Sequence, residues 1–298
     1  MSAPVQYQVR HSTAYAYGGT VAHAHHLLHL SPRMTATQTC LEHSLEFWPQ
    51  GTLSAPAQDA FGNQVTRLEM DRPHGNLEVT TRMRVSLAPR PAGDPASSRP
   101  WELVRDDLRY DATPVNPDAL EALRYRPQSA YVPIKSVFEH YARDCFTPGL
   151  PILLGAEALM RKIHTEFSYA QGETDIGTRL LDVLNTRRGV CQDFAHFMIA
   201  CLRSFGLAAR YVSGYLHNRP SDGGAELTGA DASHAWVAVY APPFGWVELD
   251  PTNNLRVDQE HVVLAWGRDF DDVSPMRGVI LGGGSQSLEV GVTVQLLK

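Results

Sequence analysis

A continuous apolar segment between Gly189 and Gly206, VCQDFAHFMIACLRSF, constrains the fold more than any other part of the chain. Its apolar residues surround almost the whole axis of a helix, and such a helix must be buried. The polar residues Gln192, His196 and Arg203 are spaced by four and seven positions, so they lie roughly on one face. The segment therefore predicts a central helix around which the rest of the protein packs.

The residues before this segment begin with a β-rich region. Residues 4–90 alternate short Val, Leu, Thr and Tyr runs with turn signals such as YGGT and FGNQ, a pattern typical of antiparallel strands. In LEVTTRMRVSL, residues 77–87, every second position from Leu77 is apolar or threonine, which predicts a strand with one buried face. Residues 88–100, APRPAGDPASSRP, are too rich in proline for a helix or an inner strand, so we interpret them as a linker.

Beyond the linker the sequence pattern becomes helical. NPDALEALRY offers Asn116 as an N-cap and Pro117 as the first helical residue, and SVFEHYARDCF and LPILLGAEALMRKIHTEF continue the pattern. Strand-like runs follow the central helix at 207–216, 233–240, 244–250 and 277–297. A chain of 298 residues is long enough for two units. Since strand-like segments come first and helical segments follow, we expect an α+β fold. Its parts are an N-terminal antiparallel β domain at 1–100, a helical connection at 101–150 and a core at 151–298 that includes the C-terminal strands.

Composition limits the partners and the location of the protein. The formal net charge of −6 gives no basic surface for nucleic acid or anionic lipid. The start, MSAPVQYQVRHSTAYAY, lacks a basic segment followed by an apolar one, and no run reaches the roughly 18 apolar residues of a membrane span. We therefore expect a cytoplasmic protein without nucleic-acid or membrane partners. The oligomeric state stays open, a dimer included.

The four cysteines, Cys40, Cys145, Cys191 and Cys201, form no C-x-x-C pair and are too few for a disulfide framework. Cys191 is either a small core residue or a reactive thiol. Its place in the first turn of the predicted helix favours the thiol, because free backbone N–H groups and the helix dipole stabilise a thiolate there. Cys201 lies about 15 Å further along the axis and lacks this benefit, so we assign it to the core.

A reactive thiol needs a base, and the histidine nearest in sequence cannot serve. Five residues of helix turn His196 about 140° away from Cys191. In SHAWVAVYAPPFGWVELDPTNN, His234 begins one strand and Asp250 ends the next. If Tyr240 pairs with Trp246 or with Phe244, Asp250 lies on the same face as His234. A cysteine, a histidine and an aspartate that can orient the histidine are the groups needed for covalent acyl transfer.

Four motifs carry a family resemblance: GVCQDFAH, GLAARYVSGY, SHAWVAVY and WVELDPTNN. Together they resemble the transglutaminase-like superfamily, in its bacterial branch of cysteine peptidases with an N-terminal β domain, and residues 261–278 resemble the segment that follows the core there. The resemblance implies a papain-like core with Cys191 as nucleophile, His234 as base and Asp250 as the residue that orients the base. Many relatives have Asp where this chain has Asn254.

This resemblance implies a thiol-dependent amide or isopeptide hydrolase that forms a thioester and uses no cofactor. Its substrate would be a peptide, a protein or a small amide. A transglutaminase, which transfers the acyl group to an amine, and a catalytically silent binding module of the same fold are the alternatives. The sequence contains no D-x-D-x-D-G calcium loop. Tyr169 and Gln192 are candidates for the second oxyanion donor, and Trp236 and Trp246 either line the cleft or belong to the core.

Three further motifs have plainer interpretations. In HAHHLLHLSP, residues 23–32, the side chains of His23, His25 and His29 share one face of a predicted strand, which allows a zinc site but favours a solvated strand face, because no cysteine or acidic residue joins them. RDFDD is expected to be a solvated turn, and GGGS a flexible hairpin link.

Overall fold

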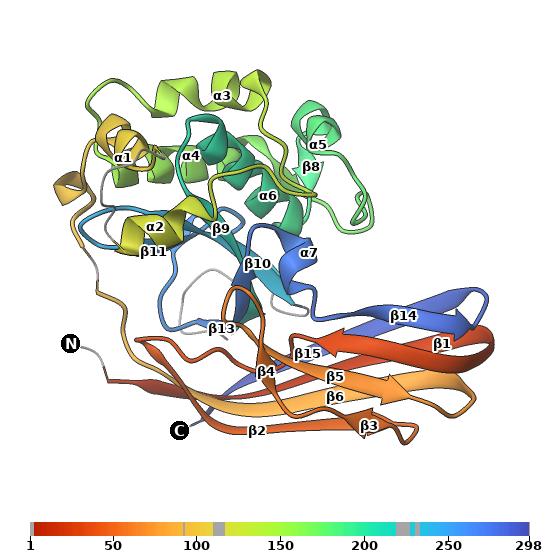
Figure 1. The fold of residues 1–298 in the computed structure, drawn as a ribbon. Helices are drawn as coiled ribbons and strands as arrows, with labels where there is room; N and C mark the ends of the chain where they lie inside the picture. Colours follow the sequence, from red (N-terminus) through yellow and green to blue (C-terminus); the bar gives the residue numbers. More distant parts are fainter. Residues whose placement is uncertain (1–2, 92, 110–116, 219–226, 230–232, 298) are drawn as a thin grey trace.

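Two antiparallel sheets carry the fold, one of eight strands and one of five (Figure 1). The computed structural model describes residues 3–91, 93–109, 117–218, 227–229 and 233–297. The eight-stranded sheet contains both the N-terminal and the C-terminal strands, and the five-stranded sheet lies beside the helices. This is the expected α+β architecture, an N-terminal antiparallel sheet followed by a helix-containing core.

The long strand β1, Val5–Leu28, is the centre of the eight-stranded sheet. On one side it pairs with β6, His74–Leu87, and β5, Gln64–Met70. The remaining strands on that side are β2, Gln38–Trp48, β3, Thr52–Leu53, and β4, Ala57–Gln58. In β6 the alternate residues Leu77, Val79, Met83 and Val85 are all buried, as the sequence pattern predicts.

The long strands of this sheet turn back near residues 17–20 and 282–286, so the sheet covers itself (Figure 1). Backbone hydrogen bonds join the two bends, from Gly18 N to Ser285 O at 2.7 Å and from Gly283 N to Thr20 O at 3.0 Å. Gly283 has φ 86°, a conformation that side chains other than glycine's disfavour. The bend encloses a small apolar core that includes Val21, Leu28, Leu68, Met70 and Leu77.

The C-terminal strands belong to this sheet and not to the core with which we grouped them. β14, Met276–Gly282, pairs with residues 21–28 of β1, and β15, Gln286–Leu297, pairs with residues 6–17. The GGGS segment thus joins two strands that follow the same partner around the bend. A strand's own pattern specifies its buried face but not its partner, and β1 offers a second edge to which these residues can pair.

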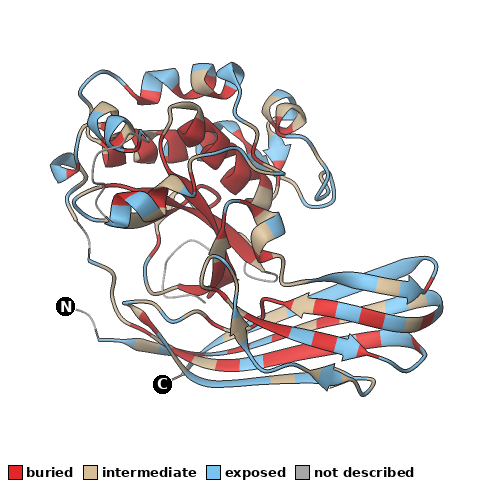
Figure 2. Ribbon diagram, in the orientation of Figure 1, coloured by how far each residue is buried: buried red, intermediate tan, exposed pale blue. Residues whose placement is uncertain are grey.

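The five-stranded sheet has the strand order β12-β11-β10-β9-β13. Its strands are β9, Ala209–Leu216, β10, His234–Tyr240, β11, Trp246–Asp250, β12, Leu255–Arg256, and β13, His261–Gly267. Helix α6, Cys191–Ser204, packs against β9 and β10 and is buried along almost its whole length (Figure 2). The prediction of a central buried helix is therefore confirmed.

Three helices pack against α6: α3, Ser136–Ala142, α4, Ile152–Glu166, and α5, Leu180–Thr186 (Figure 1). Helix α1, Trp101–Asp107, contacts α4, and α7, Phe270–Val273, contacts β9 and β13. A further short helix is α2, Pro117–Leu123. Two short strands, β7, Ser168–Tyr169, and β8, Arg188–Gly189, lead into α6, and single 3₁₀ turns occur at Pro95–Ser97 and Arg143–Cys145. The predicted N-cap Asn116 lies outside the described residues. Within them, no helix is both long enough and apolar enough to cross a membrane.

The polar residues of α6 are buried and hydrogen-bonded. His196 Nε2 accepts a hydrogen bond from the Phe270 backbone N–H at 3.1 Å, and the Arg203 guanidinium donates to backbone carbonyls that include Tyr125 and Arg268. Asp269 of the RDFDD motif is also buried, where it accepts from the backbone N–H groups of Tyr131 and Asp271. The expectation of a fully solvated turn is therefore wrong at Asp269, whose carboxylate begins α7 and joins two loops.

Two side-chain amides attach the N-terminal region to the edge strand β13. Gln38 accepts from the Val263 N–H at 2.8 Å and donates to the Val263 carbonyl at 2.7 Å. Asn63 makes the same pair of contacts with Trp266, both at 2.9 Å. Each amide thus occupies backbone groups that a sixth strand would otherwise pair.

Candidate active site

Cys191 is the first residue of α6 and is 8% exposed. The turn before it is fixed by Asp193, whose carboxylate accepts from the Val190 N–H at 2.8 Å and from the Thr174 hydroxyl at 2.7 Å. A side chain at position 189 would collide with Asp193, since an added Cβ on Gly189 would lie 2.7 Å from its Oδ2. The thiol therefore sits at a helix start whose backbone is held firmly in place.

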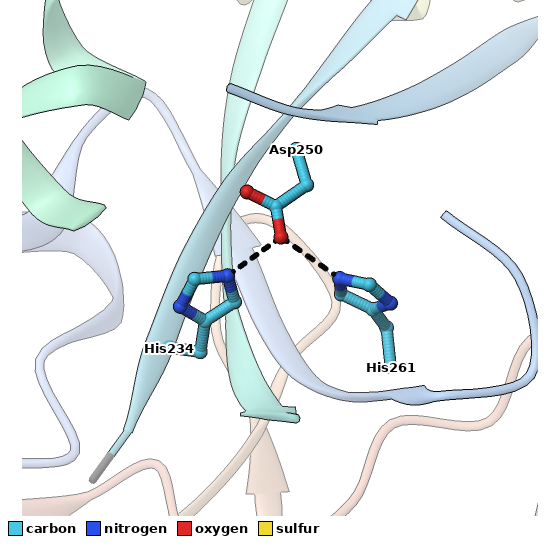
Figure 3. A group of neighbouring side chains, drawn as sticks. All are labelled: His234, Asp250 and His261. Carbon is cyan, nitrogen blue, oxygen red and sulfur yellow. Dashed lines mark hydrogen bonds and ion pairs between the residues drawn. The ribbon is translucent and has the colours of Figure 1, made fainter. Parts of the chain in front are cut away.

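His234 and Asp250 meet as the even strand register predicts. Tyr240 pairs with Trp246 and Val237 with Leu249, which brings the start of β10 to the end of β11. His234 Nε2 donates to Asp250 Oδ2 at 2.8 Å, and neither side chain is exposed (Figure 3). With Nε2 engaged, Nδ1 is the imidazole atom left for the thiol, and it has no other hydrogen-bond partner among the described residues.

Charges in this cluster oppose the effect of burial on both partners. Burial disfavours the charged imidazole, but the charge and hydrogen bond of Asp250, together with the hydrogen bond and charge of Cys191, raise the pKa of His234. Burial likewise disfavours the charged carboxylate, but His234 and His261 hold the pKa of Asp250 well below its ordinary value. The arrangement favours a protonated imidazole between two acidic groups, which is the state that stabilises a neighbouring thiolate.

Sequence reasoning missed two residues that also hold the Asp250 carboxylate. His261 Nε2, from the start of β13, donates to Oδ2 at 3.1 Å (Figure 3). Asn253 Nδ2 donates to the same oxygen at 2.8 Å, and the backbone N–H of Thr252 donates to Oδ1 at 2.9 Å. The sequence did contain a signal for His261: in HVVLAW a histidine stands at the start of an apolar strand-like run, as His234 does in SHAWVAVY.

The other cysteines lack these surroundings. Cys201 is fully buried, and burial raises its pKa well above the ordinary thiol value, as its assignment to the core anticipates. Burial raises the pKa of Cys145 to about 11, and it also raises the pKa of the half-buried Cys40. All four cysteines are free thiols.

The residues proposed for the cleft lie in different places. Gln192 follows Cys191 and is half-buried, as is Tyr169 on β7, whose ring centre lies 6.3 Å from that of Phe194. Trp236 is fully buried beneath the two histidines, with its ring centre 6.0 Å from that of His234 and 5.0 Å from that of His261. A fully buried Trp236 belongs to the packing and does not line an open cleft.

Trp246 begins β11, at the opposite end of that strand from Asp250. It packs on Arg210, and its Nε1 donates to Glu121 at 2.9 Å.

Among the described residues, one group could hold a metal ion: His234, Asp250 and His261, whose ligand atoms lie within 4.8 Å of one another. The Nε2 atoms of both histidines donate hydrogen bonds to the Asp250 carboxylate, and these bonds by themselves account for the close approach of the three side chains. The histidines of HAHHLLHLSP do not form a cluster. His23 and His25 are exposed on β1, whereas His29 lies beyond the end of that strand, where it contacts Asp59 and the Ser274 carbonyl. The prediction that His29 shares their face is wrong because the strand ends at Leu28.

Comparison with known proteins agrees with this architecture. Residues 7–86 match the bacterial transglutaminase-like N-terminal region, and residues 139–251 match the transglutaminase-like superfamily. An uncharacterized protein of Mycobacterium tuberculosis (strain H37Rv) is 36% identical over 99% of this chain and 94% of its own length. The chain belongs to the transglutaminase-like superfamily.

Two further similarities of this transglutaminase-like chain are more distant. A solved structure from Cytophaga hutchinsonii, described as a candidate cysteine protease, has the same fold, with a TM-score of 0.76, 20% identity and coverage of 100% of this chain and 92% of that one. A protein-glutamine gamma-glutamyltransferase of Pseudomonas aeruginosa is 34% identical over 37% of this chain and 17% of its own length. Membership of the transglutaminase-like superfamily indicates an enzyme.

Proposed function

We propose that this protein is a thiol-dependent amide or isopeptide hydrolase in which Cys191, His234 and Asp250 carry the reaction. The observation that supports it most directly is the buried hydrogen bond of 2.8 Å between His234 Nε2 and Asp250 Oδ2, with Nδ1 left to act on the Cys191 thiol. Nucleophile, base and orienting group thus come from α6, β10 and β11.

The proposed reaction begins when the Cys191 thiol gives its proton to His234 Nδ1 and the thiolate attacks the amide carbonyl carbon. The carbonyl oxygen becomes an oxyanion, which backbone N–H groups at the start of α6 can stabilise. Collapse of this intermediate breaks the C–N bond, and His234 protonates the departing amine. A thioester on Cys191 remains.

Water completes the proposed cycle. His234, now neutral, takes a proton from a water molecule that attacks the thioester. The carboxylic acid product leaves, and the proton returns to Cys191 through His234. Asp250 stays ionised throughout, keeps Nε2 protonated and stabilises the imidazolium. These steps use only side chains and water, so we propose no cofactor, and the substrate is a peptide, a protein or a small amide.

Transfer of the acyl group to a primary amine is the alternative activity, because the thioester is common to both reactions. The partial similarity to a glutamyltransferase supports this alternative. A labelled primary amine added during turnover separates the two. Accumulation of acid without incorporation of the amine supports hydrolysis, and stoichiometric incorporation supports transfer.

A screen of glutaminyl, peptide and isopeptide amides tests the proposed function, with Cys191→Ala as the inactive variant and Cys201→Ala as the matched control from the same helix. Iodoacetamide labelling should modify Cys191 faster than Cys40, although Cys40 is the more exposed residue. A Cys191 that labels no faster than Cys40 would contradict an activated thiol. Selective labelling without turnover of any amide would favour the binding module.

A further inference from the structure

A cavity of about 510 Å³ lies where the N-terminal region meets the five-stranded sheet. Thr37 and Arg90 contribute from the N-terminal side, and Arg210, Trp246 and Glu248 contribute from the sheet. Cys191, His234 and Asp250 do not line it. The cavity is therefore separate from the candidate active site.

Arg210 is the most unusual residue of this cavity. Its side chain is 6% exposed, and its guanidinium lies between two indole rings, 3.7 Å from the centre of Trp266 and 4.3 Å from the centre of Trp246. Nε has no hydrogen-bond partner, and the ion pair that the residue forms with Glu121 is long, at 3.8 Å from Nη1. The guanidinium carbon of Arg210 also lies 5.9 Å from the centre of the Tyr125 ring. A buried guanidinium normally donates close hydrogen bonds to an anion. The carboxylates of Glu248 and Glu121 supply negative charge near Arg210, but neither accepts a close hydrogen bond from it among the described residues.

Two more arginines line the cavity, and both already form close ion pairs. Arg90 pairs with Glu248 at 2.7 Å, and Arg256 pairs with Glu157 and donates to the Gly93 carbonyl at 2.7 Å. Each nevertheless has one buried Nη2 without a hydrogen-bond partner. Three arginines and two carboxylates, Glu248 and Asp258, line the cavity. The partners of Arg256 and Arg210, Glu157 and Glu121, lie outside the lining.

The walls of the cavity are apolar where they are not charged. Phe244, Trp246, Val257 and Leu153 supply these surfaces. Guanidinium groups match the planar, two-oxygen geometry of a carboxylate, and the indole and phenyl rings match an apolar or aromatic body.

We propose that this cavity is a binding site for an organic carboxylate with an aromatic body, whose anionic group accepts hydrogen bonds from Arg210. The site is built jointly by the N-terminal region and the sheet, so carboxylate binding gives the N-terminal region a role of its own. It is also connected to the histidine cluster, because Glu248 accepts from Trp236 Nε1 at 2.6 Å and Trp236 packs on His261.

Direct binding to the full chain, measured by ligand-observed NMR and calorimetry at low salt, tests the site without reference to activity. Benzoate and benzamide are the first probes, because they match in shape and differ in charge. N-acetylphenylalanine and N-acetylphenylalaninamide repeat the comparison for the carboxylate at a peptide C-terminus. We expect saturable binding of at least one acid, at least tenfold tighter than that of its amide. Selective binding of benzoate identifies a free acid as the ligand type, and selective binding of the peptide acid identifies a C-terminus.

Arg210→Gln should weaken binding of the acid at least tenfold, whereas Arg188→Gln, which removes an exposed arginine paired with Glu173, should leave it unchanged. If Arg210→Gln does not fold, Arg256→Gln tests the same cavity with the Arg210 stack intact and should also weaken binding. The proposal would be overturned if the protein bound acids and amides equally well. It would also be overturned if Arg210→Gln and Arg256→Gln bound the acid as tightly as Arg188→Gln does.

Discussion

Two histidines donate to the same oxygen of Asp250, and their surroundings give them opposite acid–base behaviour. His234 lies between Asp250 and the Cys191 thiol, and these two groups together raise its pKa despite burial. His261 lies on the other side of the carboxylate, where burial lowers its pKa and the charges of His234 and Arg90 lower it further. Its Nδ1 is buried without a hydrogen-bond partner among the described residues.

The difference shows that contact with a carboxylate does not by itself make a histidine a base. The group on the far side of the ring decides which protonation state is stable. His234 has an acid there and can exchange a proton with it. His261 has none, so it stays neutral with its proton on Nε2 and serves as a fixed hydrogen-bond donor to Asp250. We therefore expect His234 to act in the chemistry and His261 to act as a positioning residue.

The largest loss of activity is expected when His234 is replaced. His234→Gln removes the group that accepts the Cys191 proton, and kcat/KM for the amide substrate should fall about 10³- to 10⁴-fold. His261→Gln is the matched control, because it removes the other histidine of the pair. Steady-state kinetics of the two variants, checked for folding by circular dichroism, provide the measurement. Equal losses in both would show that the two histidines are not functionally distinct.

A second effect arises at the carboxylate that the histidines share. Asp250→Asn removes the charge that stabilises the His234 imidazolium, so we expect kcat to fall about 10²- to 10⁴-fold with a smaller change in KM. Iodoacetamide labelling of Cys191 should also require a higher pH to reach its full rate, since the thiolate loses its protonated partner. Labelling with an unchanged pH profile would argue that Asp250 does not act through His234.

A smaller effect is expected at His261 itself. His261→Phe removes one donor to Asp250, and loss of a hydrogen bond to a charged group corresponds to about a 10- to 100-fold decrease in kcat. KM should stay the same, and the pH profile of Cys191 labelling should move because the carboxylate is held less firmly. His261→Gln, whose amide can donate in place of Nε2, should restore most of the activity. A Phe variant with wild-type kcat and pH profile would leave His261 with a purely structural role.

The smallest expected effect is on how the free energy of unfolding depends on pH. The folded-state pKa of His234 is raised above 6.5, so its ion pair with Asp250 stabilises the fold fully below pH 6.5 and loses this contribution as pH rises through the raised value. Asp250 has a lowered pKa, so its contribution is present above its ordinary value of 3.8 and is lost in acid. Urea unfolding of the wild type and of His234→Gln should therefore differ most between pH 4 and 6.5 and converge in alkali. A difference that stays the same from pH 6.5 into the alkaline range would contradict a coupled ion pair.

The sequence predicted the elements of the candidate site better than their surroundings. Cys191, His234 and Asp250 follow from a helix start and from the register of one hairpin, and both are local properties of the chain. His261 could not be placed in this way, because its position depends on the pairing of β13 with β9, where it lies opposite Leu216. For the same reason the C-terminal strands were grouped with the core, although the residues of β1 with which they pair are 248 to 291 positions away in the sequence.

Gln38 and Asn63 have a consequence for how the protein can be divided. Their amides occupy backbone groups on the outer edge of β13, which a sheet would otherwise present to solvent. An open strand edge recruits strands from other molecules. A fragment that begins at residue 101 would expose that edge, so we expect it to self-associate even where its own helices and strands can form. The N-terminal region thus covers the edge of the five-stranded sheet as well as packing beside it.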